Sequence, residues 1–289
     1  MELLQKAVQV AMLTFVLSSM LAMGLGLTVG QIVAPLRNAR LVVLALLLNF
    51  LAMPFAALAL GKFLRLDESF GVGLLLLGAS AGAPFLPKLA QIAKGDLAFA
   101  VGLMVLLMVV TVGYLPLALP LFLPGVSVDP AQIAQSLFLL MLLPLAGALL
   151  VKAKFPDVAG RIKPALDTLS SLSLVVLAAL IAITNFSNVL SVFGTGGILA
   201  GILFIAIGFA LGWFLGGSEK TVRSVSALGT AQRNIAAALV VGGQSFSDPK
   251  VVVMVVVVAT VGLLILMPLS RKLASIASDS MEKFAGAGT

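Results

Sequence analysis

Two short stretches decide how this chain folds: Gly78-Ala-Ser-Ala-Gly-Ala-Pro-Phe-Leu-Pro-Lys88 and Gly229-Thr-Ala-Gln-Arg-Asn234. Both lie inside long apolar segments. In the first, each proline removes a main-chain donor and clashes with the preceding helical turn, and the glycines weaken the helix further. The second is the most polar run inside any apolar segment. We therefore predict that both helices are interrupted, with the breaks marked by Gly82, Pro84, Pro87 and Gly229.

The rest of the chain is too apolar for a soluble protein. Of its 289 residues 61% are hydrophobic and only 10% are charged, with a mean hydropathy of +1.20; a soluble domain carries about 25% charged residues. A membrane-spanning helix needs roughly 20 mainly apolar residues, and the segments are not alternating ten-residue strands. We predict an all-α membrane protein with nine transmembrane helices, at about 5–28, 40–61, 69–92, 97–123, 132–151, 165–188, 191–216, 221–244 and 250–269.

Composition also excludes several chemistries. The chain has no Cys and no His, which removes thiol chemistry, disulfides, zinc and haem ligation, and His-based catalysis. The net charge of +7 does not indicate a nucleic-acid partner, because the basic residues lie in short gaps between apolar segments with one Trp and one Tyr in the chain. We predict no cofactor and no metal ligand set. The expected partners are the lipid bilayer and a small substrate, with no obligate protein partner evident.

The basic residues predict the orientation, because cytoplasmic loops are enriched in Lys and Arg. The first apolar segment has no basic run before it and is interpreted as a retained span. With the C-terminus in the cytoplasm, the outside segments hold only Lys6, Lys62, Arg65 and Lys250. The inside segments then hold Arg37, Arg40, Lys94, Lys152, Lys154, Arg161, Lys163, Lys220, Arg223, Arg271, Lys272 and Lys283. We predict a multi-pass protein with its N-terminus outside.

The two interrupted segments are the third and the eighth, five helices apart. An odd offset reverses direction across the membrane, so helices 1–4 and 6–9 are predicted to form an inverted repeat with helix 5 as connector. Interrupted helices at matching positions of inverted halves indicate the central site of a transporter, since unwound backbone is tolerated at that depth only inside protein or beside a cavity. Each interruption also carries a cation that we expect to be buried, Lys88 or Arg233. The alternative is that Pro and Gly merely kink packed helices.

The order of several motifs resembles the bile acid:sodium symporter family. They are Met23-Gly-Leu-Gly-Leu-Thr28, Asn49-Phe-Leu-Ala-Met-Pro54, Gly71-Val-Gly-Leu-Leu-Leu-Leu-Gly-Ala-Ser80, Lys94-Gly-Asp-Leu-Ala98, Gly229-Thr-Ala-Gln-Arg-Asn234 and Ala236-Ala-Ala-Leu239. The resemblance implies a core domain at about 40–123 and 191–269, whose broken helices cross at the membrane midplane. It also implies a panel domain at about 5–28 and 132–188, a location in a bacterial inner membrane, and transport of organic anions such as bile-acid-like, pantoate-like or 2-oxo carboxylates.

The chain departs from the family where sodium would bind. The family's Ser-Asn pair at the first broken helix falls on Leu86 and Pro87, and hydroxyl positions on the next helix become Ala100 and Met104. At the second broken helix the family's Glu and Gln fall on Gly229 and Arg233. A sodium ion prefers five or six oxygen ligands, usually including a carboxylate, as hard cations do. We therefore expect transport with weak or absent sodium dependence; sodium coupling through other ligands is the alternative.

Two interpretations of the cations at the breaks are open and compatible. Each head group could replace sodium by bonding unwound carbonyls, or it could face a cavity and bind the anionic substrate, aided by helix N-termini. The alternative is that the side chain extends to the membrane–water interface, above all for Lys88. On helix 4, Thr111 and Tyr114 are at least as consistent with packing as with binding. The predicted substrate-binding residues are Arg233, Lys88, Asn234, Thr230, Gln232, Ser80 and Asn49.

Two other functions are weighed against transport. An intramembrane serine hydrolase would use Ser80 in a Gly78-Ala-Ser-Ala-Gly82 turn, but the chain offers no His and no buried Asp pair as a general base, leaving Lys88 as the only partner. A channel would need a continuous pore lined by polar rings, and none is visible. The sequence therefore favours a transporter and not an enzyme.

Overall fold

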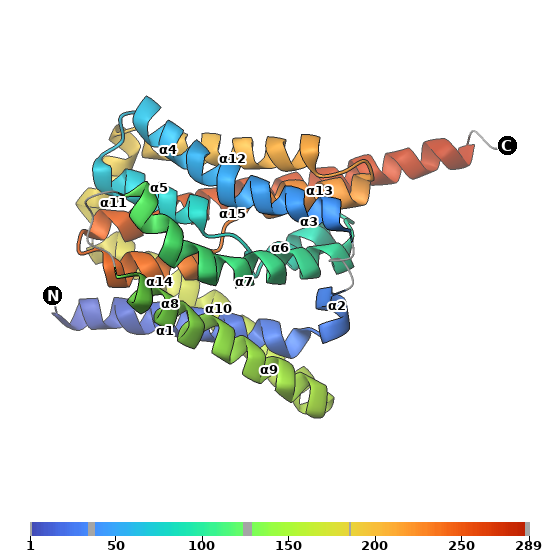
Figure 1. The fold of residues 1–289 in the computed structure, drawn as a ribbon, viewed down its shortest axis with the longest axis horizontal. Helices are drawn as coiled ribbons and strands as arrows, with labels where there is room; N and C mark the ends of the chain where they lie inside the picture. The colour runs from blue at the N-terminus through green and yellow to red at the C-terminus, as the bar shows by residue number, and fades with distance from the viewer. Residues whose placement is uncertain (1, 34–37, 124–128, 185, 287–289) are drawn as a thin grey trace.

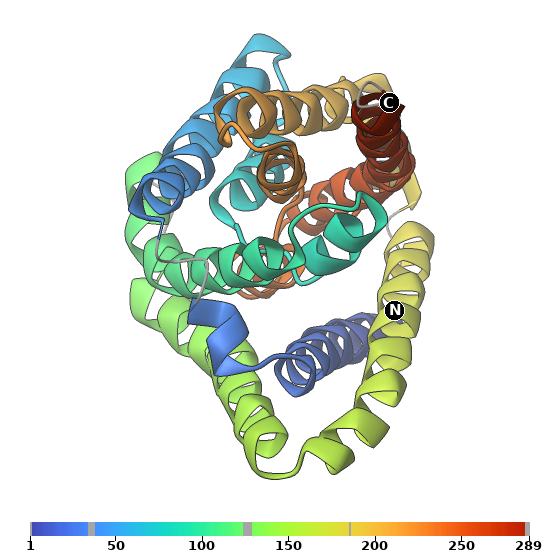
Figure 2. The ribbon, with the colours of Figure 1, turned by 90° about the vertical axis from the view of Figure 1, so that its right-hand side faces the viewer.

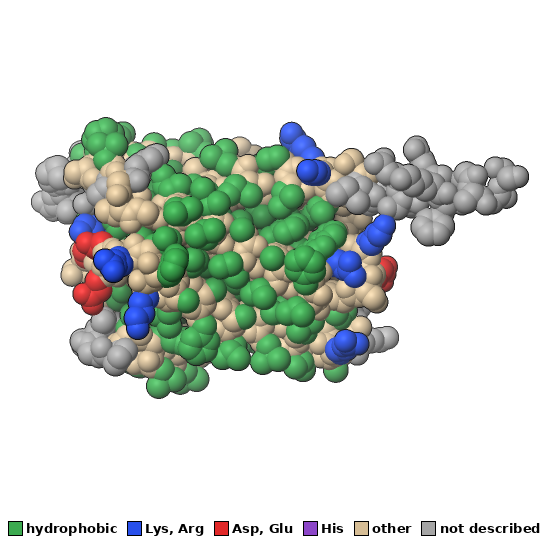
Figure 3. Space-filling model, turned by 90° about the horizontal axis from the view of Figure 1, so that it is seen from above, with side chains coloured by type: hydrophobic (Ala, Val, Ile, Leu, Met, Phe, Trp, Pro, Cys, Tyr) green, Lys and Arg blue, Asp and Glu red, His purple; other side chains and the backbone are tan. Residues whose placement is uncertain are grey.

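The protein is a bundle of helices that run along one common direction. The computed structural model describes residues 2–33, 38–123, 129–184 and 186–286, and every regular element in these ranges is a helix. The N- and C-termini lie at opposite ends of the bundle (Figure 1). Charged side chains gather at its two ends and an apolar band lies between them (Figure 3). This distribution of side chains suits a protein that crosses a bilayer along its long axis.

Within the described residues, seven helices are long and apolar enough to cross a membrane. Two further pairs are interrupted: α5 (Glu68–Ala79) with α6 (Leu86–Ile92), and α13 (Lys220–Ala231) with α14 (Ile235–Ser245). Two helices are shorter: α2 (Val29–Val33) and α11 (Phe186–Gly194). The seven long helices are α1 (Glu2–Gly26), α3–η2–α4 (Ala39–Leu47, Leu48–Ala52, Met53–Phe63), α7 (Leu97–Phe122), α8–η3–α9 (Pro130–Leu137, Phe138–Leu142, Leu143–Lys154), α10 (Pro156–Thr184), α12 (Gly197–Leu215) and α15 (Pro249–Gly286).

The predicted interruptions are therefore confirmed. Seven of the nine predicted segments contain a helix long and apolar enough to cross a membrane, and the other two contain the interrupted pairs, so nine crossings remain a prediction. Some boundaries differ from the prediction. Helix α10 begins at Pro156 rather than near residue 165, because a proline is well tolerated in the first turn of a helix. The segment predicted at 191–216 is divided by Gly196, whose φ of 78° ends α11 and begins α12. Of the residues used to predict orientation, Arg37 lies outside the described residues.

Side-chain caps fix the start of several helices. Asp67, Asp96, Asp129 and Asn234 each accept a hydrogen bond from a main-chain N–H in the first turn of α5, α7, α8 and α14, respectively. Such caps satisfy donors that have no partner within the helix. The cap at Asn234 matters most here, because it restarts a helix in the interior of the bundle.

The helices form two unequal layers. Helix α1 packs against α9 and α10, and these three enclose the lower part of Figure 2. In the larger layer α5 packs against α4 and α15, and α12 packs along α13. Helices α7 and α14 both contact α8, which links the layers.

A close approach of α12 brings α13 into the centre of the larger layer. A Cβ atom at Gly212 of α12 would lie only 2.6 Å from the Cα of Ala227 of α13, so glycine is required for this distance. Helix α13 is largely buried although it carries Ser224 and Ser226. The second interruption, at the end of α13, is thereby enclosed by protein.

Candidate functional site

The first interruption is built from an extended segment with one left-handed residue. Helix α5 ends at Ala79, and Ser80 is extended. Gly82 has a φ of +80°, and a Cβ there would lie 2.6 Å from the carbonyl oxygen of Met104 in α7. Pro84 lies within the break, as predicted. Pro87 does not, because it occupies the first turn of α6, where no main-chain donor is needed.

The second interruption lies later than the sequence predicted. Helix α13 continues to Ala231, Gln232 is extended, and Asn234 caps α14. The assignment of Gly229 to the break is therefore wrong, since this residue is inside α13. A Cβ on Gly229 would lie 3.0 Å from the side chain of Leu86. Its glycine serves close packing against α6 and not a change of chain direction.

The two interruptions touch through their main chains. The N–H of Asn234 donates to the carbonyl of Ser80 at 2.9 Å, and both residues are fully buried. The hydroxyl of Thr111 in α7 donates to the carbonyl of Ala81 at 3.0 Å and accepts from its N–H at 2.9 Å. Main-chain groups that the breaks leave without helical partners are thus paired with one another and with α7.

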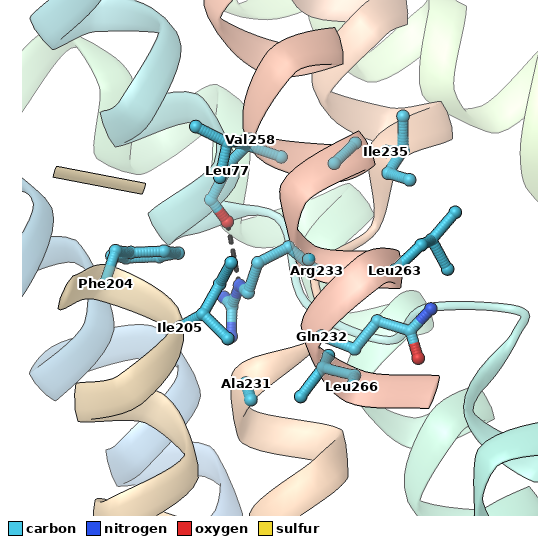
Figure 4. A pocket seen from close by; sticks show the side chains of 12 residues that line it. Leu77, Phe204, Ile205, Ala231, Gln232, Arg233, Ile235, Val258, Leu263 and Leu266 are labelled. Carbon is cyan, nitrogen blue, oxygen red and sulfur yellow. Dashed lines mark hydrogen bonds between the residues drawn. The ribbon is translucent and has the colours of Figure 1, made fainter. Parts of the chain in front are cut away.

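Arg233 lies at the centre of this contact and is buried, with a relative exposure of 5%. A guanidinium has five N–H groups and no acceptor, and here five hydrogen bonds to oxygen engage its three nitrogens. Figure 4 shows the bond to Leu77. Nε donates to Leu77 O at 2.8 Å, Nη1 to Asn49 Oδ1 at 2.6 Å and Thr230 O at 3.2 Å, and Nη2 to Gly78 O at 2.6 Å and Asn49 O at 3.3 Å.

One of these acceptors exists because of a proline. Pro54 has no N–H to give to the carbonyl of Phe50, its partner in an α-helix, or to that of Asn49, its partner in a π-turn. The carbonyl of Asn49 instead accepts from Arg233, and that of Phe50 accepts from the Tyr114 hydroxyl at 2.6 Å. The π-helix η2 (Leu48–Ala52) therefore offers two carbonyl acceptors that its own main chain does not use.

The charge of Arg233 is balanced by helix ends. All five of its bonded oxygens belong to neutral carbonyl or amide groups. Leu77 and Gly78 lie in the last turn of α5, and Thr230 lies in the last turn of α13. A helix C-terminus is equivalent to roughly −0.5 of an elementary charge. Two such ends together offset a charge of about +1, which explains how a guanidinium is accommodated here without a bonded carboxylate.

The expectation of a second buried cation is wrong. Lys88 on α6 is exposed, and its hydrogen bond to Gln91 is a long one, 3.4 Å from Nζ to Oε1. The interpretation of a flexible chain that carries its head group outward fits this position. Arg233 alone bonds the carbonyls at the end of α5, so the first interruption does not need its own cation.

Three buried polar atoms near the crossing have no protein partner: Ser80 Oγ, Gln232 Oε1 and Asn234 Nδ2. A small cavity of about 20 Å³ adjoins Arg233 and Gln232 and is otherwise lined by apolar side chains, mainly of α12 and α15 (Figure 4). That volume holds about one water molecule. The cavity is therefore too small for an organic anion in this conformation.

The structure brings most of the predicted residues together. Asn49, Ser80, Thr230, Arg233 and Asn234 meet through direct bonds, Gln232 adjoins them in the chain, and Lys88 does not take part. The sequence interpretation undervalued Thr111 and Tyr114 and missed the carbonyl acceptors of α5. The spacing of Pro54 after Asn49 and Phe50 was the available signal, since a proline inside a helix cannot donate to the carbonyl four residues before it or, in a π-turn, to the one five residues before it.

Comparison with known proteins identifies the family of this chain. The sequence profile of the "Sodium Bile acid symporter family" matches residues 12–192. The chain belongs to this family. It is 29% identical over 240 residues to "Probable sodium/metabolite cotransporter BASS2, chloroplastic" of Oryza sativa subsp. japonica, covering 81% of this chain and 57% of that protein. It is 24% identical over 197 residues to "Uncharacterized sodium-dependent transporter YocS" of Bacillus subtilis (strain 168), covering 67% of this chain and 60% of that protein. The matches thus span less than two thirds of either relative.

Proposed function

We propose that this member of the sodium bile acid symporter family is a secondary transporter that moves small organic anions by alternating access. The observation that carries the proposal is the enclosed crossing of two interrupted helices around Arg233. Interrupted helices that meet inside a helical membrane protein are the usual setting of a substrate or ion site. The names of both relatives describe transporters, which supports the same class.

The proposed arrangement in the membrane follows the sequence interpretation. The chain crosses nine times in a bacterial inner membrane, with its N-terminus outside and its C-terminus in the cytoplasm. Helices 1–4 and 6–9 form inverted halves whose broken helices cross at the midplane. The core is at about 40–123 and 191–269, and the panel at about 5–28 and 132–188. The opposite positions of the termini support an odd number of crossings (Figure 1).

Arg233 is proposed to serve as a built-in cation. Its guanidinium already takes up Asn49 Oδ1 and four main-chain carbonyls, which are the hard oxygen ligands that a sodium ion would use. A free cation would have to displace a tethered one of equal charge. Sodium, as a co-transported substrate, is therefore expected to have a weak effect or none.

The same bonds limit how Arg233 can act on the substrate. With its five hydrogen bonds already directed to protein oxygens, it acts on an anion by holding the crossing together rather than by direct contact. The groups proposed to meet the substrate are those with unpaired atoms, Ser80, Gln232 and Asn234, the last at the positive end of α14. Lys88 is the exposed cation proposed to attract the carboxylate on its way.

The direct test is uptake into proteoliposomes. Radiolabelled pyruvate, pantoate and taurocholate are offered in sodium buffer and in choline buffer of equal ionic strength. We expect at least one of these anions to enter, with a rate in choline at least half of that in sodium. Uptake of none of them would contradict the anion class.

A variant tests the built-in cation. Arg233→Ala empties the guanidinium position, so uptake should fall at least tenfold, and added guanidinium chloride should restore part of it. Lys88→Gln is the matched control, since it removes a cation that does not bond the crossing and should leave sodium independence unchanged. Undiminished uptake by Arg233→Ala would contradict this role, and so would a folded Arg233→Ala protein whose lowered uptake guanidinium does not restore.

A second candidate is a sodium-coupled symporter with unusual ligands. The unpaired oxygens Ser80 Oγ and Gln232 Oε1 favour it, because both could accept a cation contact. It predicts that uptake collapses in choline buffer. It also predicts that Gln232→Ala raises the sodium concentration needed for half-maximal uptake.

A further inference from the structure

The protein contains two π-helices in the same local setting. The helix η2 (Leu48–Ala52) comes two residues before Pro54, and η3 (Phe138–Leu142) comes two residues before Pro144. In each case the first residue of the following α-helix donates five residues back, Met53 to Leu48 and Leu143 to Phe138. The proline that follows cannot donate to the carbonyls four and five residues before it. Each π-helix therefore has two carbonyls that need another partner.

The first π-helix is held from both sides. Leu48, Asn49 and Phe50 are buried. The two deprived carbonyls accept from Arg233 and from Tyr114, as described above. A π-helix whose carbonyls are bonded by a side chain of α7 and by one from the α13/α14 break has little freedom to change its arrangement.

The second π-helix has no such support. Among the hydrogen bonds of the described residues, no side chain donates to the carbonyl of Leu139 or Leu140, which Pro144 leaves without its N–H. Only Met141 of η3 is buried. Phe138 is 50% exposed and Leu139 is 44% exposed. Segments with few buried contacts and unsupported main-chain bonds are those that deform at least cost.

The second π-helix also lies where its helix passes from one layer to the other. Before it, α8 contacts α7 and α14 of the larger layer. After it, α9 contacts α1 and α10 of the smaller layer and diverges from α7 and α14 (Figure 1). The contact of α9 with α1 is tight, because a Cβ on Gly24 would lie 2.6 Å from the carbonyl oxygen of Leu145. Motion of α9 would therefore carry α1 with it.

We propose that η3 and Pro144 form a hinge on which α9, α1 and α10 tilt as one body against the remaining helices. Bending at η3 changes the surroundings of the carbonyls of Leu139 and Leu140, which accept no side-chain hydrogen bond among the described residues. It also changes the surroundings of the exposed apolar side chains of η3. The purpose of this motion rests on the proposed function, in which alternating access requires one layer to move against the other. The motion itself requires no substrate.

Distances between spin labels test the hinge in the full chain, reconstituted in liposomes without substrate. The chain has no native Cys, so two introduced cysteines define each pair. The first pair joins Leu150 of α9, 62% exposed, to Phe214 of α12, 79% exposed. The second joins the exposed Gln135 of α8 to Phe214. We expect a broad or two-peaked distance distribution for the first pair and a narrow one for the second.

Two proline variants complete the design. Pro144→Ala supplies an N–H to one of the deprived carbonyls and should narrow the first pair's distribution by at least half. Pro54→Ala is the matched control, since it makes the same chemical change after η2, whose carbonyls are bonded by Arg233 and Tyr114. It should leave the distance distribution of the first pair as broad as in the wild type. A wild-type distribution equally narrow for both pairs, or no narrowing in Pro144→Ala, would overturn the hinge. Because the wild-type comparison needs neither variant nor transport, it decides the matter even if a variant misassembles or uptake is absent.

Discussion

The two helix interruptions have opposite hydrogen-bonding character. The α5/α6 break presents acceptors, the carbonyls of Leu77, Gly78 and Ser80. The α13/α14 break presents donors, the guanidinium of Arg233 and the N–H of Asn234. Each break thus supplies what the other lacks. Two interrupted helices can be stable inside a membrane protein when they are complementary in this way, because donors of one break then pair with acceptors of the other.

This difference explains why only one of the two cations is buried. The end of α5 is the negative end of a helix and needs donors. Arg233 reaches it from the other break with a planar set of N–H groups, which Lys88 could not match with one flexible ammonium. The polar run Gly229–Asn234 was therefore the stronger sequence signal, and the proline-rich run marked only the change in chain direction.

The largest effect is expected from removing the guanidinium of Arg233, the main donor of the α13/α14 break. Arg233→Ala leaves Asn49 Oδ1 and several buried carbonyls without a partner, and each unsatisfied buried acceptor costs about 1–3 kcal/mol. We expect the free energy of unfolding to fall by at least about 4 kcal/mol, or folding to fail. Arg233→Lys should recover part of the loss, since it keeps the charge with fewer donors. Thermal unfolding in detergent measures both.

Lys88→Gln is the control for that measurement. An exposed side chain with one long hydrogen bond should change stability by less than about 0.5 kcal/mol. Equal losses for Lys88→Gln and Arg233→Ala would contradict the asymmetry between the two breaks.

The α5/α6 break, which presents the acceptors, is tested by replacing its glycine in the left-handed conformation. Gly82→Ala places a Cβ in a left-handed conformation and against the main chain of α7, at Met104 and Met108. Main chain cannot move aside as a flexible side chain can, so we expect a loss of about 3 kcal/mol. Gly113→Ala is the matched control on α7, because a Cβ added there would meet nothing within 4 Å. It should be neutral or slightly stabilising, and a similar loss for both would contradict the specific role of Gly82.

Sequence reasoning recovered the helical class, both interruptions and most of the residues at the crossing. Apolar length, proline and a polar run are local signals, and each has a direct physical consequence for a helix in a membrane. The outward position of Lys88 could not be predicted, because a side chain's direction depends on how the seven-residue helix α6 packs. Gly229 was misplaced for a related reason: glycine permits a break but also permits close packing, and only the position of Leu86 distinguishes the two.

A smaller effect is expected at the π-helix that supports Arg233. Tyr114→Phe removes the donor to the carbonyl of Phe50 while keeping the ring that contacts the Phe50 ring, whose centre lies 4.8 Å away. We expect a loss of about 1 kcal/mol, with Arg233 still in place. Because the two breaks remain bonded, sodium independence should persist in uptake assays. Sodium-dependent uptake by this variant would show that η2, and not Arg233 alone, decides the cation preference.

The smallest effect is expected where each interrupted pair begins, at the N-terminus of α5 and at the N-terminus of α13. At the start of α5, Asp67 caps Ser69 and binds Lys250 of α15 at 2.8 Å, while Asp248 accepts from the Ser69 hydroxyl at 2.6 Å. At the start of α13, Glu219 provides no side-chain cap. The hydrogen bond from Lys250 lowers the pKa of Asp67 below its usual value of 3.8, against the opposing effect of burial.

A lowered pKa in the folded state makes this contribution depend on pH in a definite direction. The contribution is complete above the ordinary Asp pKa, near pH 4, and is lost as the pH falls through the lower folded value. Asp67→Asn keeps a capping side chain but removes the charge, so its stability should differ from that of the wild type above about pH 5 and converge with it towards about pH 3. The difference should be small and should shrink with added salt, because the pair is partly exposed. Thermal unfolding of both proteins across this range is the measurement, with Glu219→Gln as control. A stability difference between Asp67→Asn and the wild type that widens as the pH falls would show that Asp67 does not stabilise α5 through its charge. The starts of α5 and α13 would then both lack a charge-dependent contribution to stability.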